Sequence, residues 1–188
     1  MAVLHLKITL KGSKPAITRD ILVEDKDTFE DLHDIIQVVM PWDGDHAWSF
    51  EKGRDISFIM SAEFKMDKTD KLASGVKLSS FFKLAKTKID YTYDFGDNWE
   101  HEVLLVKILE PKAGNVYPVC IKGQNACPPE DCGGLWGYYD MLETIKNPKH
   151  DDYEEMRDWL GLEGTDVYDP TAFDIEDVND DLGGIFIA

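Results

Sequence analysis

The feature that most constrains the fold is a pair of alternating stretches that meet at a short polar turn. Large apolar side chains occupy every second position of residues 89–95, as in a strand with one buried face. Gly96-Asp97-Asn98 has the composition of a turn, and a second long strand is expected over residues 99–109. The spacing predicts a β-hairpin, so part of the chain should form an antiparallel sheet.

The remaining periodic segments predict further strands and several helices. Asp27, followed three residues later by Glu30, is expected to cap a helix over 29–39 that ends before Pro41. Residues 119–134, rich in Cys, Pro and Gly, are expected to form a loop. The other expected strands are 3–10, 16–23, 46–50 and 56–60, and the other expected helices are 78–85, 135–145, 153–160 and 171–178.

This order of elements predicts an α+β fold. We expect a mixed, mostly antiparallel sheet with an N-terminal hairpin followed by a helix, and further helices at the C-terminal end. A β-grasp-like core is compatible with that beginning. The 188 residues match the size of one domain, and no linker or repeat divides them, so residues 1–188 are expected to form a single domain.

The charge of the chain is concentrated in its second half. Residues 1–89 carry 14 acids and 14 bases, whereas residues 90–188 carry 23 acids and 6 bases, which gives the whole net charge of −17. Such a chain is poorly suited to gripping phosphate backbones, which argues against nucleic acid as a partner. The acidic half is a solvated face, a docking surface for a basic protein partner or a surface that attracts metal ions.

Hydropathy and the N-terminus point to a cytoplasmic protein. No apolar run approaches the roughly 18–20 residues that a membrane span requires. The first residues alternate like a strand and have neither the basic nor the apolar region of a signal peptide. We therefore expect no membrane association, while the oligomeric state is not fixed by the sequence.

The first candidate cluster for chemistry lies at the predicted hairpin turn. Asp94, Asp97 and His101 would meet at one end of the sheet, and Trp99 should share a face with His101. Carboxylates beside an imidazole can bind a metal or perform acid–base catalysis. The alternative is a turn held by its own polar side chains, with His101 packed beside Trp99.

The second candidate cluster contains all three cysteines. Cys120, Cys127 and Cys132 are spaced C-x6-C-x4-C, and thiolates are good ligands for zinc or another divalent cation. A fourth ligand would have to come from elsewhere, for example from His101 or His150. The alternative is three reduced thiols in a packed loop.

Glu130 and Asp131 belong to the same segment and precede Gly133-Gly134. They are interpreted either as caps of the following helix or as inward-facing acids paired with His101 or a lysine. His33 and His46 are interpreted as packing or hydrogen-bonding residues. His150 precedes an acidic helix start, and it is interpreted either as part of the capping chemistry there or as a member of a candidate polar cluster with Asp94, Asp97, His101, Glu130 and Asp131. The central expectation is that this segment folds against the hairpin turn and brings Asp94, His101, Glu130 and Asp131 together.

Taken in order, these motifs resemble the plasmid pRiA4b ORF-3-like protein family. The first signature is Tyr93-Asp94-Phe95-Gly96-Asp97 with Trp99 and His101, and the second is Pro128-Pro129-Glu130-Asp131 with Gly133-Gly134 and Gly137-Tyr138. The supporting residues are Leu32-His33, Trp42, His46, Trp159-Leu160-Gly161, Asp169-Pro170, Phe173-Asp174 and Asn179. The resemblance implies an α+β domain but brings no established activity.

Three functions remain open at this point. The sequence favours a non-enzymatic binding or accessory module, because phosphate-loop, nucleophile-elbow, zinc-protease and dinucleotide motifs are all missing. The alternative is a metal-assisted hydrolase using Asp94, His101, Glu130 and Asp131. Nucleic-acid binding ranks last, and the resolvase label carried by some family members is unsupported, because the three arginines are scattered and no basic helix-turn-helix is present.

Overall fold

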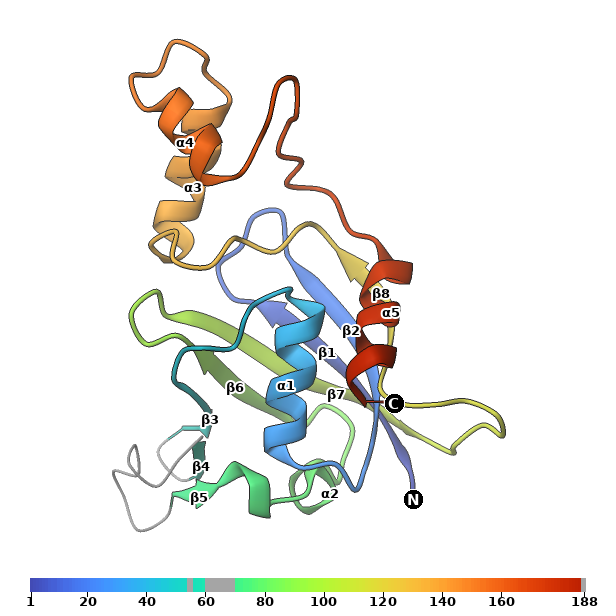
Figure 1. Cartoon of the computed structure of the whole chain (residues 1–188). Helices are drawn as coiled ribbons and strands as arrows, with labels where there is room; N and C mark the ends of the chain where they lie inside the picture. Colours follow the sequence, from blue (N-terminus) through green and yellow to red (C-terminus); the bar gives the residue numbers. More distant parts are fainter. Residues whose placement is uncertain (54–55, 60–69, 187–188) are drawn as a thin grey trace.

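The computed structural model describes residues 1–53, 56–59 and 70–186, and it confirms the α+β fold (Figure 1). In chain order the elements are β1 (Val3–Leu10), β2 (Thr18–Glu24), α1 (Phe29–Val39), β3 (Trp48–Lys52), β4 (Ile56–Ile59), β5 (Lys71–Leu72), the 3-10 turn η2 (Ala73–Gly75), α2 (Leu78–Phe81), β6 (Lys88–Tyr93), β7 (Trp99–Leu109), β8 (Val119–Gln124), α3 (Gly134–Ile145), α4 (Tyr153–Trp159) and α5 (Ile175–Phe186). Residue 60, the last of one predicted strand, lies outside the described residues.

The described strands form one sheet in the order β5-β4-β3-β6-β7-β1-β2-β8. Every neighbouring pair is antiparallel except β4 and β5, which are parallel. The predicted hairpin is confirmed: β6 pairs with β7, and Tyr93 opposite Trp99 closes the ladder at the turn. The N-terminal hairpin of β1 and β2 is confirmed as well, and the β-grasp-like comparison remains a prediction.

The core lies between one face of the sheet and the helices α1 and α5, which lie side by side across it (Figure 1). The alternation of side chains along β1 gives the sheet its buried face. Leu4, Leu6 and Ile8 are buried against the core, while His5 and Lys7 face the more exposed side. Phe29, Leu32, Ile36 and other buried residues of α1 cover the strands. Burial of these side chains is the main term that holds the helix against the sheet.

The cap of α1 differs from the sequence prediction by one residue. Thr28 is the N-cap, and it exchanges hydrogen bonds with Asp31 in a capping box. The predicted pair of Asp27 and Glu30 was therefore wrong. Asp27 instead accepts a hydrogen bond from the backbone N–H of Glu24, and partial burial raises its pKa to about 6.

The segment after β7 is more regular than predicted. Residues 119–124 form the edge strand β8, so the expectation of a loop over 119–134 was wrong at its start. The side-chain amide of Asn179 on α5 donates to the Cys120 carbonyl (3.0 Å) and accepts from the Cys120 N–H (2.8 Å). The amide thus satisfies backbone groups of the edge strand, as a neighbouring strand would.

The helices α3 and α4 pack together in a lobe beyond the end of the sheet (Figure 1). The chain then returns to the sheet, and the Tyr168 hydroxyl donates to the Cys127 carbonyl on the way. The predicted helix at 171–178 begins later and runs further, as α5. None of the helices in the described ranges is long and apolar enough to cross a membrane.

Candidate functional site

The turn between β6 and β7 is held by its own polar groups. The Asp94 carboxylate accepts the Gly96 N–H (2.8 Å), and the Asp94 carbonyl accepts the Asn98 N–H (2.6 Å). Asp94 and Asn98 both have positive φ, at 53° and 56°, which Asp and Asn tolerate better than most residues. The turn chemistry predicted for Gly96-Asp97-Asn98 therefore extends back to Asp94.

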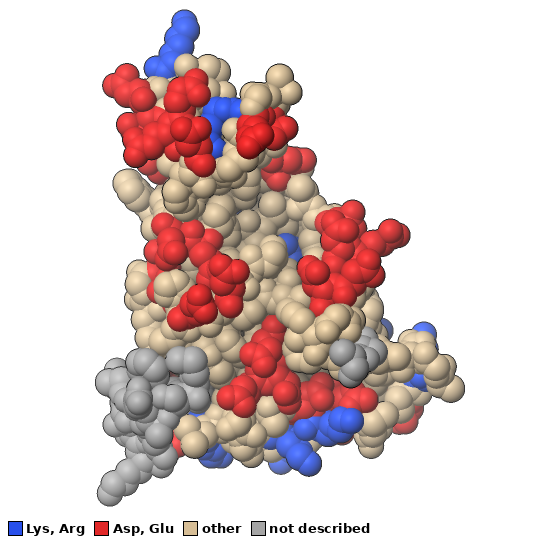
Figure 2. Space-filling view, in the orientation of Figure 1, with Lys and Arg blue, Asp and Glu red and all other residues tan. Residues whose placement is uncertain are grey.

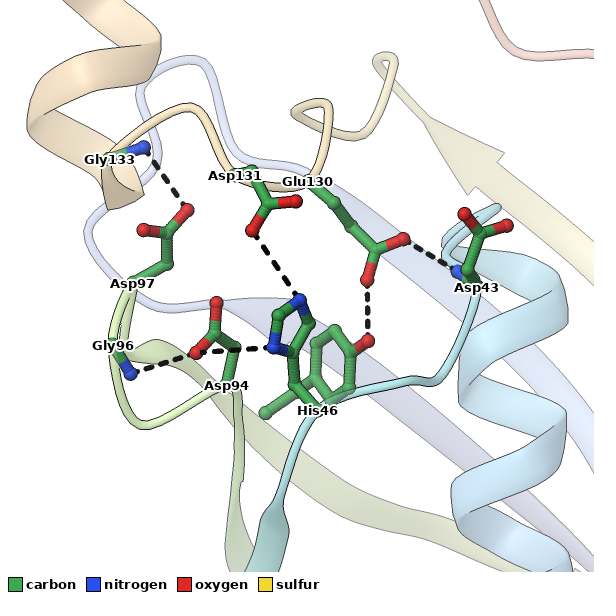
Figure 3. Close-up of polar contacts among 9 residues, drawn as sticks. Asp43, His46, Asp94, Gly96, Asp97, Glu130, Asp131 and Gly133 are labelled. Carbon is green, nitrogen blue, oxygen red and sulfur yellow. Dashed lines mark hydrogen bonds and ion pairs between the residues drawn. The ribbon is translucent and has the colours of Figure 1, made fainter.

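The loop before α3 lies directly against this turn (Figure 3). The Gly133 N–H donates to the Asp97 carboxylate at 3.1 Å. At Gly134, which has a φ of +68°, a Cβ would lie 2.4 Å from the Asp97 carbonyl oxygen. The close approach of the two segments requires a glycine there. The two stretches carrying the family-like signatures thus fold against each other, as expected from the sequence.

Glu130 ties the same loop to two further segments. Its carboxylate accepts the Tyr93 hydroxyl (2.5 Å) and the Asp43 N–H (2.6 Å), while the Trp42 indole N–H donates to the Pro128 carbonyl (3.0 Å). Burial, and then the Glu130 carboxylate, raise the pKa of Tyr93, so the phenol stays protonated and donates. We call the contact of residues 41–47, 94–98 and 125–133 the junction.

His46 lies in the junction between two carboxylates (Figure 3). Its Nδ1 is 3.9 Å from Asp94 Oδ1, and its Nε2 is 3.4 Å from Asp131 Oδ1. One ligand atom from each of these three residues lies within 4.8 Å of the others. Among the described residues, this is the single group of three His, Cys, Asp or Glu side chains with such spacing.

His101 does not join this group. Its ring is fully buried, 5.4 Å from the Trp42 ring and 5.5 Å from the Tyr91 ring, and Trp99 is buried on the same face as predicted. Burial lowers the pKa of His101 to about 4, which keeps the imidazole neutral. The structure therefore brings together Asp94, Asp131 and His46, whereas the hydrolase hypothesis required His101.

The three cysteines are free, and in the described part of the chain they form no ligand group of three. Cys120 is buried in β8, where its backbone is bonded to Asn179. Burial raises the pKa of all three thiols, that of Cys132 to about 12, which disfavours the thiolate that binds metal. His101 is in the core, and His150 is at the exposed start of α4, 3.8 Å from Asp152.

A cleft of about 780 Å³ opens beside the junction, between α3 and α4. Trp136 and Trp159 line it and are 81% and 49% exposed. Figure 2 shows patches of Asp and Glu over this lobe, with few Lys or Arg side chains nearby. The remaining lining residues are Asp131, Cys132, Gly133, Gly137, Asp140, Met141, Asp152, Glu155 and Met156.

Two features of the site were missed by sequence reasoning. His46 was interpreted as a packing residue, and its position between two aspartates depends on contacts distant in the chain. Trp136 carries a readable signal, because it falls outside the apolar stripe of α3 that includes Leu135, Tyr138 and Leu142. An apolar residue off that stripe is expected to face solvent.

Comparison with known proteins then identifies the family. A profile of the plasmid pRiA4b ORF-3-like protein family matches residues 2–177. The chain belongs to this family. The match includes both signatures of the junction and all of α3 and α4.

Two proteins similar to this pRiA4b ORF-3-like chain illustrate what is known. The uncharacterized protein y4hQ of Sinorhizobium fredii (strain NBRC 101917 / NGR234) is 31% identical over 184 residues, which cover 96% of this chain and 92% of that protein. The crystal structure of MM3350 from Methanosarcina mazei Go1, a protein of unknown function, has a TM-score of 0.84 at 41% identity and covers 94% of this chain and 97% of that chain. These similarities give the family and the fold, and neither name describes an activity.

Proposed function

We propose that this protein is a non-enzymatic binding module that holds a basic segment of a protein partner in the cleft between α3 and α4. The observation that carries the proposal is the combination of two exposed tryptophans with four carboxylates around one cleft. Trp136 and Trp159 supply the aromatic surface. The carboxylates are those of Asp131, Asp140, Asp152 and Glu155.

This lining suits a lysine or arginine side chain better than an apolar one. The aliphatic stem of such a side chain packs on Met141, Met156 and the indole faces, while its charge meets carboxylates at the rim. A cation over a tryptophan face gains about 0.5–2 kcal/mol, depending on how far it is desolvated. Tryptophan is also among the residues that most often dominate binding energy at protein interfaces.

The charge of the surrounding chain supports the same kind of partner. Residues 151–181 contain 13 acids and one base, Arg157. Arg157 itself donates to the carbonyls of Leu162, Gly164 and Asp166. The field of the lobe should therefore speed the approach of a positively charged segment and repel nucleic acid.

We further propose that residues 1–188 form one pRiA4b ORF-3-like domain and that this domain acts in the cytoplasm. The single domain is supported by the family match over residues 2–177 and by the single sheet that strands from both halves of the chain share. The cytoplasmic location is supported by three cysteines that all remain free thiols, as is usual in a reducing compartment.

The proposal is tested by fluorescence anisotropy with a labelled octa-arginine peptide and the full chain. The double variant Asp140→Asn/Glu155→Gln removes two charges from the cleft. The double variant Glu143→Gln/Glu154→Gln removes two charges from the same helices outside the lining. We expect Kd to rise at least about tenfold in the first variant and less than about twofold in the second.

Trp136→Ala separates a formed site from general attraction between opposite charges. Because the Trp136 side chain is 81% exposed, its loss should leave the fold intact and still weaken peptide binding about tenfold. Leu84→Ala, which removes a side chain that is 75% exposed elsewhere, is the matched control. Equal binding by both charge variants, together with no effect of Trp136→Ala, would refute the proposal.

A further inference from the structure

We infer that His46, Asp94 and Asp131 form a binding site for a divalent transition-metal ion of the zinc class. The site lies in the junction and is argued from different observations than the cleft, although Asp131 borders both. Each ligand comes from a different part of the chain: the loop before β3, the turn after β6 and the loop before α3. The fold therefore assembles the site, and no short sequence motif does so.

The separations suit ligands of one ion better than direct hydrogen bonds. His46 Nε2 and Asp131 Oδ1 are 3.4 Å apart, which is too long for a good charge-assisted hydrogen bond. Two ligands bound at about 2.1 Å in tetrahedral geometry lie about 3.4 Å from each other. His46 is 36% exposed and Asp131 72% exposed at the side chain, so small rotations can bring the third ligand to the same ion.

The local charge also lacks a lysine or arginine counterion. Across the ranges that the structure describes, neither Asp94 nor Asp131 forms an ion pair with a lysine or arginine, and His46 lies beside both carboxylates. Asp94 is only 8% exposed, and its carboxylate accepts a hydrogen bond from the Gly96 N–H. A largely buried carboxylate is stabilised when a cation binds beside it.

The donor set determines the class of ion. One imidazole nitrogen and two carboxylate oxygens suit Zn²⁺, Co²⁺ or Mn²⁺, whereas Mg²⁺ and Ca²⁺ favour oxygen ligands alone. Three protein ligands leave at least one coordination position for water. The partial exposure of His46 and Asp131 gives that position access to solvent.

Isothermal titration of the reduced, metal-free full chain with Zn²⁺ at pH 7.5 tests the site. We expect one Zn²⁺ per chain and no measurable heat of binding with Mg²⁺. His46→Gln should weaken Zn²⁺ binding at least about tenfold. Asp131→Asn changes an exposed side chain and should weaken Zn²⁺ binding by a similar factor. His150→Gln is the matched control, because His150 also pairs with an aspartate but has no third ligand within reach in the described chain.

Co²⁺ provides a second readout that distinguishes this site from the cysteines. Co²⁺ in the proposed site should give visible d–d absorption without a sulfur-to-metal charge-transfer band, and the absorption should disappear in His46→Gln. The inference is overturned if wild-type protein takes up no Zn²⁺, if His46→Gln and Asp131→Asn bind like wild type, or if a thiolate band dominates. Circular dichroism of each variant establishes that the fold is retained.

Discussion

The junction and the α3–α4 cleft contain the same kinds of side chain, yet they place them in opposite environments. In the junction, Trp42 is 6% exposed and its indole N–H is bonded to the Pro128 carbonyl. In the cleft, Trp136 is 81% exposed. Aromatic and acidic residues near one another therefore do not by themselves indicate a binding surface. Burial and hydrogen bonding show which group supports the fold and which remains free to bind.

The largest expected difference between the two regions is in stability. Trp42 packs against the rings of Tyr93 (5.1 Å), Trp99 (5.7 Å) and His101 (5.4 Å). Trp42→Ala should therefore lower the free energy of unfolding by about 3–5 kcal/mol. Trp136→Ala should change it by less than about 0.5 kcal/mol. Urea denaturation of both variants checks this, and equal losses would remove the distinction between the regions.

The next largest effect concerns the close approach of Gly134 to Asp97 of the junction. Gly134 and Gly161 have nearly the same φ, +68° and +66°, but only Gly134 would place a Cβ against another backbone. Gly161→Ala should lower the free energy of unfolding by about 1–2 kcal/mol, because alanine disfavours the left-handed conformation. Gly134→Ala should lower it by at least about 1 kcal/mol more, because the loop must also move away from Asp97. Thermal unfolding measures the difference, and identical values would contradict the packing of the junction.

A smaller effect concerns the pH dependence that the buried His101, in the core beside Trp42, gives the stability of the fold. Burial lowers the pKa of this ring from 6.5 to about 4, so between these pH values the unfolded chain binds the proton more readily. His101 should therefore make unfolding easier as the pH falls through that window, by about 2 kcal/mol between pH 7 and pH 5. In His101→Phe, the free energy of unfolding should therefore fall by about 2 kcal/mol less than in wild type between pH 7 and pH 5.

The comparison of wild type and His101→Phe is necessary because other groups titrate in the same range. Burial lowers the pKa of His33 to about 3, whereas it raises the pKa of Asp34 to about 6, so their effects on stability oppose each other. Urea denaturation at pH 7 and pH 5 gives the difference between the two proteins. If both proteins lose the same stability over this interval, His101 is not a buried neutral imidazole.

The sequence was informative where local periodicity decides the structure. The hairpin of β6 and β7 was predictable because alternating side chains and a polar turn act within about twenty residues. β8 was missed because its short Cys- and Gly-containing stretch is recognisable as a strand only through its pairing with β2. His46 was missed for the same reason, since its two neighbouring aspartates lie about 50 and 85 positions further along the chain.

Hydrogen–deuterium exchange of the full chain, with and without octa-arginine peptide, tests most directly whether the cleft is the binding surface. We expect slower exchange in α3 and α4 on peptide addition, with β6, β7 and the turn at Asp94–Asn98 unchanged. That pattern should be lost in Asp140→Asn/Glu155→Gln and retained in Glu143→Gln/Glu154→Gln. Slower exchange confined to the junction, or no change in α3 and α4 at peptide concentrations that saturate the anisotropy, would contradict it.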